Sequence, residues 1–284
     1  MSSRTCLVTG GSGYLGSELA VFLRKSGWRV IQASRHPRGA DGVAYSLGEE
    51  ISPDLFQGVT ALVHGAYDFA PRRWDAIYQR NVIGTRQLLQ RAKEAGVLTI
   101  TISSISAFPG CKSFYGKAKL LMEEATQAVG GVVLRPGLIY GGSNQGIYGR
   151  LLKQVEGRTF VPLLSGNPCT LHLTHVEDLA KVINGWLNGA WPAQAHPWVV
   201  AHPEPWPMKK LLRAMGEAKG RKLRFIPAPW PLVWIALKFF EQIGLPLDFK
   251  SDNLISIVNQ DPHLDFSAVT ACGIPMRPFQ PDLE

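Results

Sequence analysis

Short apolar runs alternate with longer amphipathic stretches along the first two thirds of the chain. The short runs are typical of buried strands, which are predicted at 5–8, 29–33, 61–64, 98–103, 132–134 and 198–201. The longer stretches repeat their apolar residues at helical spacing, and helices are predicted at 15–25, 74–95, 117–128 and 176–187. Thr174 is expected to cap the last of these helices. Because the alternation is typical of repeated βαβ units, we predict an α/β fold with a doubly wound parallel sheet and helices on both faces.

The alternation weakens after the fifth predicted strand, where glycines and prolines become more frequent. We therefore expect a sheet domain over 1–143, to which 172–201 return. A smaller irregular region is expected to form from 144–171 and 202–284. No internal repeat, low-complexity segment or flexible linker interrupts this organisation.

The composition is that of an ordinary globular protein, since the 284 residues are 45% hydrophobic and 18% charged. Thirty Lys and Arg residues against 22 Asp and Glu give a formal net charge of +8, which raises the question of a nucleic-acid partner. The basic residues occur singly or in pairs, and no aromatic-basic RNA-binding pattern accompanies them. We predict no nucleic-acid partner, because a site for an anionic small molecule explains the excess equally well.

The cysteines are widely separated and have no partner at metal-ligand spacing; they are Cys6, Cys111, Cys169 and Cys272. The sequence therefore predicts neither a disulfide framework nor a metal site, and favours a cytoplasmic location. The N-terminus runs within a few residues into the first predicted strand, which is not the pattern of a signal peptide. The apolar stretch 227–240 contains three prolines and Lys238, so no membrane span is predicted.

A glycine-rich turn follows the first predicted strand and precedes the first helix. Its residues are Thr9-Gly10-Gly11-Ser12-Gly13-Tyr14-Leu15-Gly16. Glycines at this spacing let the chain turn sharply and bring a helix N-terminus against a pyrophosphate. A tight turn without a ligand is the alternative, but the position between strand and helix favours a dinucleotide-binding Rossmann domain. The predicted cofactor contacts are Gly10, Ser12, Gly13, Tyr14, Leu15 and Gly16.

Ser34 and Arg35 follow at the end of the second predicted strand, where a dinucleotide fold usually has an acid for the adenosine ribose hydroxyls. A carboxylate there would repel a 2′-phosphate, whereas Arg35, with Ser34 and Arg38 nearby, can pair with one. We therefore predict NADP as the cofactor, with NAD as the alternative. If Arg35 is only a solvated surface residue, the site would tolerate both.

Tyr115 and Lys119 lie four residues apart at the start of a predicted helix, after a strand that ends in three closely spaced serines. This spacing puts both side chains on one face. The Lys119 ammonium is therefore expected to lower the pKa of the Tyr115 phenol from about 10 toward the range of a general acid/base. A serine hydroxyl at the strand end can hydrogen-bond the same substrate oxygen. Whether Ser103, Ser104 or Ser106 supplies this hydroxyl stays open.

Seven short motifs follow one another along the chain, at 9–16, 61–66, 81–85, 103–106, 115–119, 135–141 and 175–180. With these motifs the chain resembles the extended short-chain dehydrogenase/reductase family, also called the NAD-dependent epimerase/dehydratase family. The resemblance covers most of the chain. It implies that Tyr115 is the catalytic acid/base, that Lys119 also holds the nicotinamide ribose, and that Ser104 polarises the substrate carbonyl or hydroxyl.

The resemblance also implies further contacts around the cofactor. Gly65 and Ala66 would line its adenosine side, while the backbone of Pro136 and Gly137 would approach the nicotinamide. Asn81 would brace the central helix. The irregular region 144–171 and 202–284 would then bind the substrate.

Two further residues are predicted to contact the substrate. Asp68 follows the third predicted strand at the ligand side of the sheet, and Arg150 lies just beyond the sixth motif. An exposed loop is the alternative for both. The apolar segment 230–240 is interpreted first as core packing of a small cap helix, and otherwise as a wall of the substrate pocket or a subunit contact. Structural roles are predicted for His64, His172 and His175.

The sequence leaves three hypotheses for function. The first is an NADP-dependent oxidoreductase that transfers hydride to or from a carbonyl or hydroxyl substrate. The second is a nucleotide-sugar epimerase or dehydratase with tightly bound NAD. The third is a sensor that binds NADP without chemistry, which the presence of both Tyr115 and Lys119 disfavours. A homodimer is left open, and the substrate itself cannot be predicted.

Overall fold

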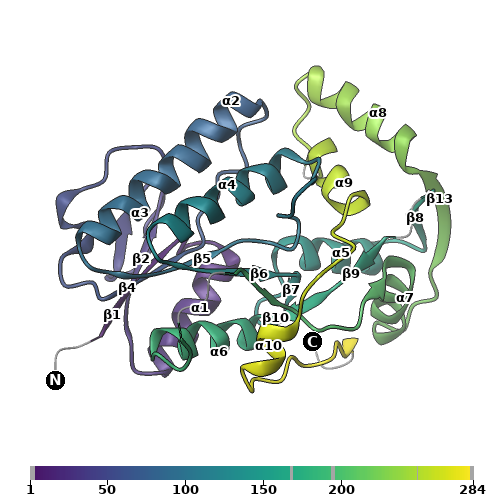
Figure 1. Cartoon of the computed structure of the whole chain (residues 1–284). Coiled ribbons are helices and arrows are strands. Elements are labelled where there is room, and N and C mark those ends of the chain that lie inside the picture. The colour runs from purple at the N-terminus through teal and green to yellow at the C-terminus, as the bar shows by residue number, and fades with distance from the viewer. Residues whose placement is uncertain (1–3, 167–168, 193–195, 248, 282–284) are drawn as a thin grey trace.

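The computed structural model describes residues 4–166, 169–192, 196–247 and 249–281. In this part of the chain, a seven-stranded parallel sheet has the order β11-β6-β5-β4-β1-β2-β3 (Figure 1). Its strands are β1 (Thr5–Thr9), β2 (Arg29–Ser34), β3 (Gly42–Ala44), β4 (Ala61–His64), β5 (Leu98–Ile102), β6 (Val132–Pro136) and β11 (Trp198–Val200). The predicted doubly wound sheet is confirmed. The winding reverses between β1 and β4, which is where such sheets bind their ligands.

Helices cover both faces of the sheet: α1 (Tyr14–Lys25) and α6 (Val176–Leu187) lie on one side, α3 (Gly84–Glu94) and α4 (Phe114–Ala128) on the other (Figure 1). A short 3-10 helix, η1 (Pro53–Phe56), precedes β4. Successive side chains of β1 are buried on opposite faces of the sheet. Cys6 and Val8 are buried with α1 and α6, whereas Leu7 is buried with α3. Because both faces are covered, the strands are continuous apolar runs, and this made them visible in the sequence.

The single helix predicted over 74–95 consists of α2 (Trp74–Ile77), a π-helical turn η2 (Tyr78–Ile83) and α3. Buried Asn81 lies in this π turn. Its side-chain oxygen accepts the Asp68 N–H at 2.7 Å, and its amide donates to the Asp68 carbonyl at 3.1 Å. Asn81 therefore fixes the loop after β4 at the carboxyl edge of the sheet, where π turns are often functional.

The prediction that Thr174 caps α6 is wrong. The cap is His175, whose Nδ1 accepts the Glu177 N–H at 3.2 Å. The Thr174 hydroxyl is engaged elsewhere, because it donates to the Val200 carbonyl at 2.6 Å and accepts the Gly137 N–H at 2.9 Å.

The second region contains more regular structure than predicted. Its strands pair two by two: β8 (Phe160–Ser165) with β13 (Arg224–Pro229), and β9 (Thr170–Leu171) with β12 (Trp206–Pro207). A further pair, β7 (Leu138–Tyr140) with β10 (Leu173–His175), lies at the border with the sheet domain. The helices of the second region are α5 (Gly146–Gly157), α7 (Met208–Ala218), α8 (Trp230–Gln242) and α9 (Ser251–Val258). Tyr148, Leu211 and Met215 are buried together in a core of its own. Short, partly exposed strands produce no long apolar run, so the sequence pattern did not separate them from loops.

Helix α8 lies at the edge of the molecule (Figure 1). None of its residues is buried. The interpretation of 230–240 as core packing of a cap helix is therefore wrong, although one side of α8 rests on α9 and β13. In the described part of the chain, no helix has the length and apolar character needed to cross a bilayer.

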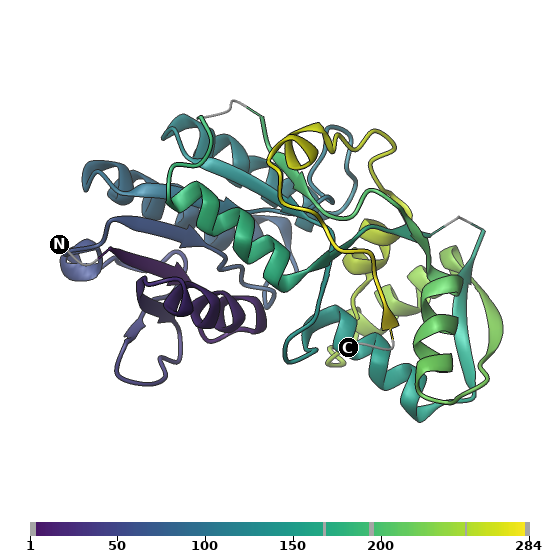
Figure 2. The same ribbon diagram turned by 90° about the horizontal axis from the view of Figure 1, so that it is seen from below.

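The C-terminal segment returns to the sheet domain through α10 (Ser267–Ala271), whose Val269 is buried with Trp198. Figure 2 shows this yellow segment running along the junction between the two parts of the molecule. There, the Arg277 guanidinium pairs with the buried carboxylate of Asp178 at 2.9 Å and with Glu177 at 3.0 Å. These contacts hold the last part of the described chain on α6.

Candidate active site

The glycine turn between β1 and α1 can be adopted only with glycine at key positions. Gly10 has a φ of +73°, which favours glycine, and a Cβ on Gly16 would lie 2.3 Å from the Gly10 carbonyl oxygen. A Cβ on Gly10 would come within 3.2 Å of the Ala66 backbone, so this turn and the loop after β4 are in contact. No side chain caps the first turn of α1. The backbone therefore forms a cradle at a helix N-terminus, which fits a pyrophosphate.

A buried hydrogen-bonded chain holds these two loops together. Thr9 Oγ1 lies 2.7 Å from His64 Nδ1, and His64 Nε2 lies 2.9 Å from Thr85 Oγ1. The Ala66 N–H donates to Thr9 Oγ1 at 3.3 Å. Burial lowers the pKa of His64 to about 3, and the charge of Lys119 adds to this effect. His64 is therefore a neutral structural residue, as predicted.

The end of β2 carries the residues predicted to distinguish NADP from NAD. The Ser34 hydroxyl is buried and has no hydrogen-bond partner among the described residues. The Arg35 side chain is 61% exposed, and its Nη1 lies 3.4 Å from Asp68 Oδ1. Arg80 Nε lies 3.8 Å from the other oxygen of that carboxylate. Asp68, predicted as a substrate contact, thus lies beside Arg35 near the end of β2.

The predicted hydroxyl–tyrosine–lysine set comes together at the carboxyl end of β5 and the start of α4. The Ser104 side chain lies close enough to Tyr115 to lower the pKa of its phenol. Buried Lys119 lies one turn further along α4, with its Nζ 5.9 Å from the centre of the Tyr115 ring, and donates to the Ile102 carbonyl at 2.8 Å. All three groups therefore face one place at the edge of the sheet.

The expectation that Lys119 lowers the pKa of Tyr115 is wrong for this structure. Burial raises the pKa of Tyr115 to about 12, and the hydrogen bond from Ser104 offsets only part of this rise. Burial also lowers the pKa of Lys119 from 10.5 to about 8, while the nearby Glu123 opposes that change. Desolvation is the largest cause of both shifts, because it disfavours the charged form of each group.

The structure separates the roles of the neighbouring serines. The hydroxyl of buried Ser103 donates to the Glu123 carboxylate. Glu123 also accepts two hydrogen bonds from Arg135, at 2.8 and 2.6 Å. The Ser104 oxygen accepts the Ser106 N–H at 3.2 Å and reaches Tyr115. Ser103 is thus committed to an internal ion pair, and Ser104 is the hydroxyl in contact with Tyr115.

Sequence reasoning missed a carboxylate that fixes the start of α4. Asp252, on α9, accepts the Phe114 N–H at 2.7 Å and the Tyr115 N–H at 3.0 Å. The Gly116 N–H is satisfied by Ser113, the helix's own cap, at 3.0 Å. No local pattern links Asp252 to a helix more than a hundred residues earlier. The second region therefore helps position Tyr115 through a tertiary cap.

Two aromatic residues beside Tyr115 were also missed. Tyr67 packs edge-on against Tyr115 with ring centres 5.0 Å apart, and Phe69 stacks on Tyr115 at 5.9 Å. Lys119 Nζ lies 5.3 Å from the Tyr67 ring centre. Their position directly after β4 could have identified them in the sequence, since loops at this edge of the sheet line the ligand crevice. Two aromatic rings therefore pack against the Tyr115 ring.

The remaining predicted contacts lie on both sides of this centre. Pro136 ends β6, and its carbonyl accepts the Ile105 N–H at 3.1 Å, which ties the Ser104 loop to the neighbouring strand. Gly137 passes so close to β10 that a Cβ would lie 2.1 Å from the His172 carbonyl oxygen. Tyr14 donates to the Gly141 carbonyl at 2.6 Å and joins the glycine turn to the loop after β7. Arg150 occupies an exposed position on α5.

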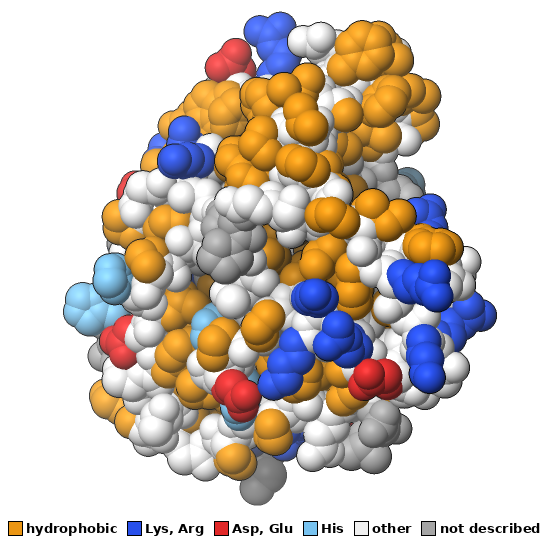
Figure 3. Space-filling model, turned by 90° about the vertical axis from the view of Figure 1, so that its right-hand side faces the viewer, with side chains coloured by type: hydrophobic (Ala, Val, Ile, Leu, Met, Phe, Trp, Pro, Cys, Tyr) orange, Lys and Arg blue, Asp and Glu red, His pale blue; other side chains and the backbone are white. Residues whose placement is uncertain are grey.

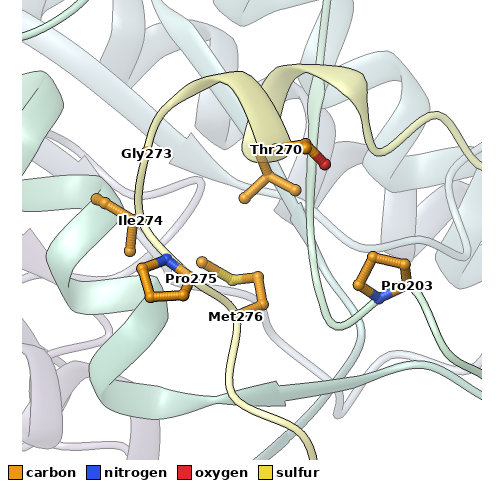
Figure 4. Close-up of a pocket in the computed structure, with 7 residues that line it drawn as sticks. Pro203, Thr270, Gly273, Ile274, Pro275 and Met276 are labelled. Carbon is orange, nitrogen blue, oxygen red and sulfur yellow. The ribbon is translucent and has the colours of Figure 1, made fainter.

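A cavity of about 290 Å³ lies elsewhere, between the loop after β11 and the C-terminal segment (Figure 4). Its lining residues are Pro203, Val269, Thr270, Gly273, Ile274, Pro275 and Met276. None of them belongs to the elements that carry the glycine turn, Ser104 or Tyr115. This cavity is therefore separate from the candidate active site.

Comparison with known proteins agrees with the fold and the motifs. Residues 4–202 match the family described as RmlD substrate binding domain. The ceramide reductase of Caulobacter vibrioides is 29% identical over 184 residues, which cover 61% of this chain. The chain covers 57% of that protein's length, and 32% and 52% of the length of two further relatives.

Two solved structures share the fold. UDP-glucose 4-epimerase of Thermotoga maritima, determined with UDP-glucose, has a TM-score of 0.74 and 18% identity, over 98% of this chain and 96% of that one. A short-chain dehydrogenase/reductase superfamily protein of Agrobacterium tumefaciens with bound NAD has a TM-score of 0.65 and 22% identity, over 89% and 95%. At these identities the likeness concerns the fold.

The fold is that of the extended short-chain dehydrogenase/reductase superfamily. Within it, the chain belongs to the family described as RmlD substrate binding domain. The resemblance predicted from the motifs is therefore confirmed.

Proposed function

We propose that this chain is an NADP-dependent oxidoreductase that transfers hydride between the nicotinamide and the carbonyl or hydroxyl carbon of a largely apolar small molecule. The observation that carries the proposal is that Ser104, Tyr115 and Lys119 meet at the carboxyl edge of the sheet, with Lys119 Nζ 5.9 Å from the centre of the Tyr115 ring. Two hydroxyls that meet in this way can bind one substrate oxygen together. The direct test follows NADPH consumption with ketones of increasing chain length. No consumption with any of them would contradict the proposal.

The residues at the carboxyl edge of the sheet fit a dinucleotide. The turn tolerates no Cβ at Gly16, and the buried hydroxyl of Ser34 lacks a partner among the described residues. When bound, the cofactor would supply or accept the hydride. The residues proposed to hold its pyrophosphate are Gly10, Ser12, Gly13, Tyr14, Leu15 and Gly16. Gly65 and Ala66 would face its adenosine half, and Pro136, Gly137 and Lys119 its nicotinamide half.

In the reducing direction, Tyr115 donates its phenolic proton to the substrate oxygen while the Ser104 hydroxyl hydrogen-bonds the same oxygen. Because the pKa of Tyr115 is raised to about 12, the phenol is protonated at neutral pH and starts as an acid. The Lys119 ammonium lies on the same helix face and stabilises the phenolate that forms. Alcohol oxidation uses the same groups in reverse.

An apolar substrate is supported by the surroundings of Tyr115. The rings of Tyr67 and Phe69 lie directly beside it. One of the sequence relatives is a reductase named for ceramide, an apolar substrate. Aromatic rings next to the reacting oxygen favour an aliphatic or aromatic neighbour over a highly hydrated sugar.

We predict that Arg35→Ala raises the Kd for NADPH about ten- to a hundredfold and changes the Kd for NADH by no more than about twofold. A guanidinium bonded to a 2′-phosphate is worth about 1.5–3 kcal/mol, and NADH has no such phosphate. Titration of the cofactors by intrinsic fluorescence gives both constants. Arg73→Ala, at an 88% exposed side chain, is the matched control. Equal effects of Arg35→Ala on both cofactors would argue against this role.

One observation favours the second candidate, a nucleotide-sugar epimerase or dehydratase with bound NAD. The Asp68 carboxylate, supplied by the loop after β4, lies 3.4 Å from Arg35 and offers acceptor oxygens near the end of β2. Such oxygens can bind the ribose hydroxyls of NAD. Analysis of nucleotide released on denaturing the purified protein distinguishes the candidates, since copurified NAD favours the second one.

We further predict that kcat/KM for ketone reduction falls as the pH rises through about 8. The pKa of Lys119 is lowered to about 8, so its ammonium is present below that pH and lost above it, while Tyr115 keeps its proton throughout. A pH–rate profile of the wild type measures this step. Lys117→Met, at an exposed position of the same helix, should leave the profile unchanged. A flat profile between about pH 7 and about 9.5 would exclude the assigned role of Lys119.

A further inference from the structure

The outward side of α8 is apolar, which reverses the usual arrangement of a surface helix. Leu232, Ile235, Phe239 and Ile243 are exposed to 65%, 56%, 57% and 58%. Their spacing of three and four residues puts them on one face of the helix and its last turn. The opposite side of α8 rests on α9 and β13. The helix therefore presents its apolar face to the outside instead of a charged one.

Further exposed apolar residues extend this face. Phe240, Leu245 and Phe249 are exposed at the end of α8 and in the loop that follows it, and Phe69 is 59% exposed in the loop after β4. We call these four residues, together with Leu232, Ile235, Phe239 and Ile243, the α8 patch. Figure 3 shows hydrophobic side chains gathered over this end of the molecule, with Lys and Arg side chains at its borders and below it. Contiguous apolar surfaces of this kind mark interaction sites.

Three basic residues border the α8 patch. Lys238 lies on α8 itself, Arg72 donates to the Glu241 carbonyl at 3.0 Å, and Lys250 donates to the Phe69 carbonyl. The Glu241 carboxylate accepts the N–H and the hydroxyl of Ser251 at 2.6 and 2.9 Å and lies 4.0 Å from Lys238 Nζ.

We propose that the α8 patch docks on the surface of a bilayer that contains anionic lipids. An apolar helix face with basic residues at its border is the pattern of a helix that lies in the membrane interface. With 13 residues, α8 is too short to span a bilayer, which takes about 20. A second copy of the chain fits this surface less well, because two-fold pairing would bring the same basic residues of both copies together.

The α8 patch reaches the candidate active site through Phe69. Phe69 belongs to the patch, and its exposed ring stacks on Tyr115 with ring centres 5.9 Å apart. Docking would therefore bring the surroundings of Tyr115 to the lipid surface, where an apolar carbonyl compound can enter without crossing water. This consequence, unlike the docking itself, rests on the proposed function.

Flotation with vesicles tests the docking. The full chain is mixed with vesicles of phosphatidylcholine that contain about 30 mol% phosphatidylglycerol, and with pure phosphatidylcholine vesicles. We expect binding to the anionic vesicles, weakened when NaCl is raised from about 0.05 to about 0.5 M. The variant Leu232→Ser/Ile235→Ser/Phe239→Ser should bind about tenfold more weakly or worse. The control Val21→Ser/Leu98→Ser removes exposed apolar side chains elsewhere and should bind as the wild type does.

Failure of the wild type to bind anionic vesicles, or equal binding by the triple variant, would overturn the docking. Sedimentation velocity tests the alternative that the patch binds a second copy of the chain. If the wild type is a dimer that does not bind vesicles, and the triple variant is a monomer, the patch is a subunit interface instead. Reduction of a water-soluble ketone by NADPH tests the proposed function separately. Turnover without vesicle binding refutes only the docking, and vesicle binding without turnover refutes only the function.

Discussion

Replacing Tyr115 by Phe is expected to lower kcat for carbonyl reduction about a thousandfold, because positioned acid/base groups contribute about 10²–10⁴-fold. The variant lacks only the hydroxyl that meets Ser104, and its ring can keep the contacts to Tyr67 and Phe69. Cofactor affinity should stay within about twofold of the wild type, since the cradle at the glycine turn is untouched. Steady-state rates and a cofactor titration on the same preparation measure both.

Tyr45→Phe is the matched control for this variant. Tyr45 is buried, and its hydroxyl has no partner among the described residues. Removing that hydroxyl should leave kcat unchanged and cost no stability. If Tyr115→Phe kept more than about a tenth of the wild-type kcat, Tyr115 could not be the proton donor.

Replacing Glu123 by Ala is expected to lower the free energy of unfolding by about 3–5 kcal/mol, because it leaves a charge without its partner inside the protein. The Glu123 side chain is only 4% exposed and that of Arg135 15%, with 2.6 Å between their closest atoms. The Ser103 hydroxyl would lose its acceptor as well. Urea unfolding at neutral pH gives the difference.

Two comparison variants separate this effect from a general sensitivity to losing a carboxylate. Glu94→Ala breaks an exposed pair with Arg91 and should change stability by no more than about 0.5 kcal/mol. Glu123→Leu/Arg135→Met removes both charges and should recover most of the loss, since a buried ion pair can be replaced by apolar contacts of similar volume. A loss below about 1 kcal/mol in Glu123→Ala would mean that the ion pair is not what holds β6 to α4.

The glycine turn and the Tyr115–Lys119 pair can be recognised in the sequence because their chemistry is local. A glycine at 10 or 16 is required by the turn itself, and a spacing of four residues on a helix brings two side chains to one face wherever that helix lies. The contributions of Asp252 and Phe69 have no such local pattern. Each acts on Tyr115 from a segment whose position is set by packing.

The pKa of Tyr115 shows the limit of local reasoning. A lysine one turn away predicts a lowered value, but burial raises the pKa to about 12. Desolvation depends on every neighbour within a few ångströms, including those from β4 and α9, and no sequence window contains them all. In the same way, the sequence contains three serines near Tyr115 whose hydroxyls could act with it. The structure excludes Ser103, because its hydroxyl donates to the Glu123 carboxylate.

By itself, the sequence determined the doubly wound sheet, the glycine cradle and the family, because apolar periodicity and steric demands at glycine operate over a few neighbouring residues. Only the tertiary structure decided the electrostatics around Tyr115, the tertiary cap by Asp252 and the outward direction of the α8 apolar face. The apolar run 230–240 is the clearest case. Its apolar composition predicted a buried helix, but no residue of α8 is buried. Burial of a helix requires other elements to pack over it, and whether they do depends on the whole fold.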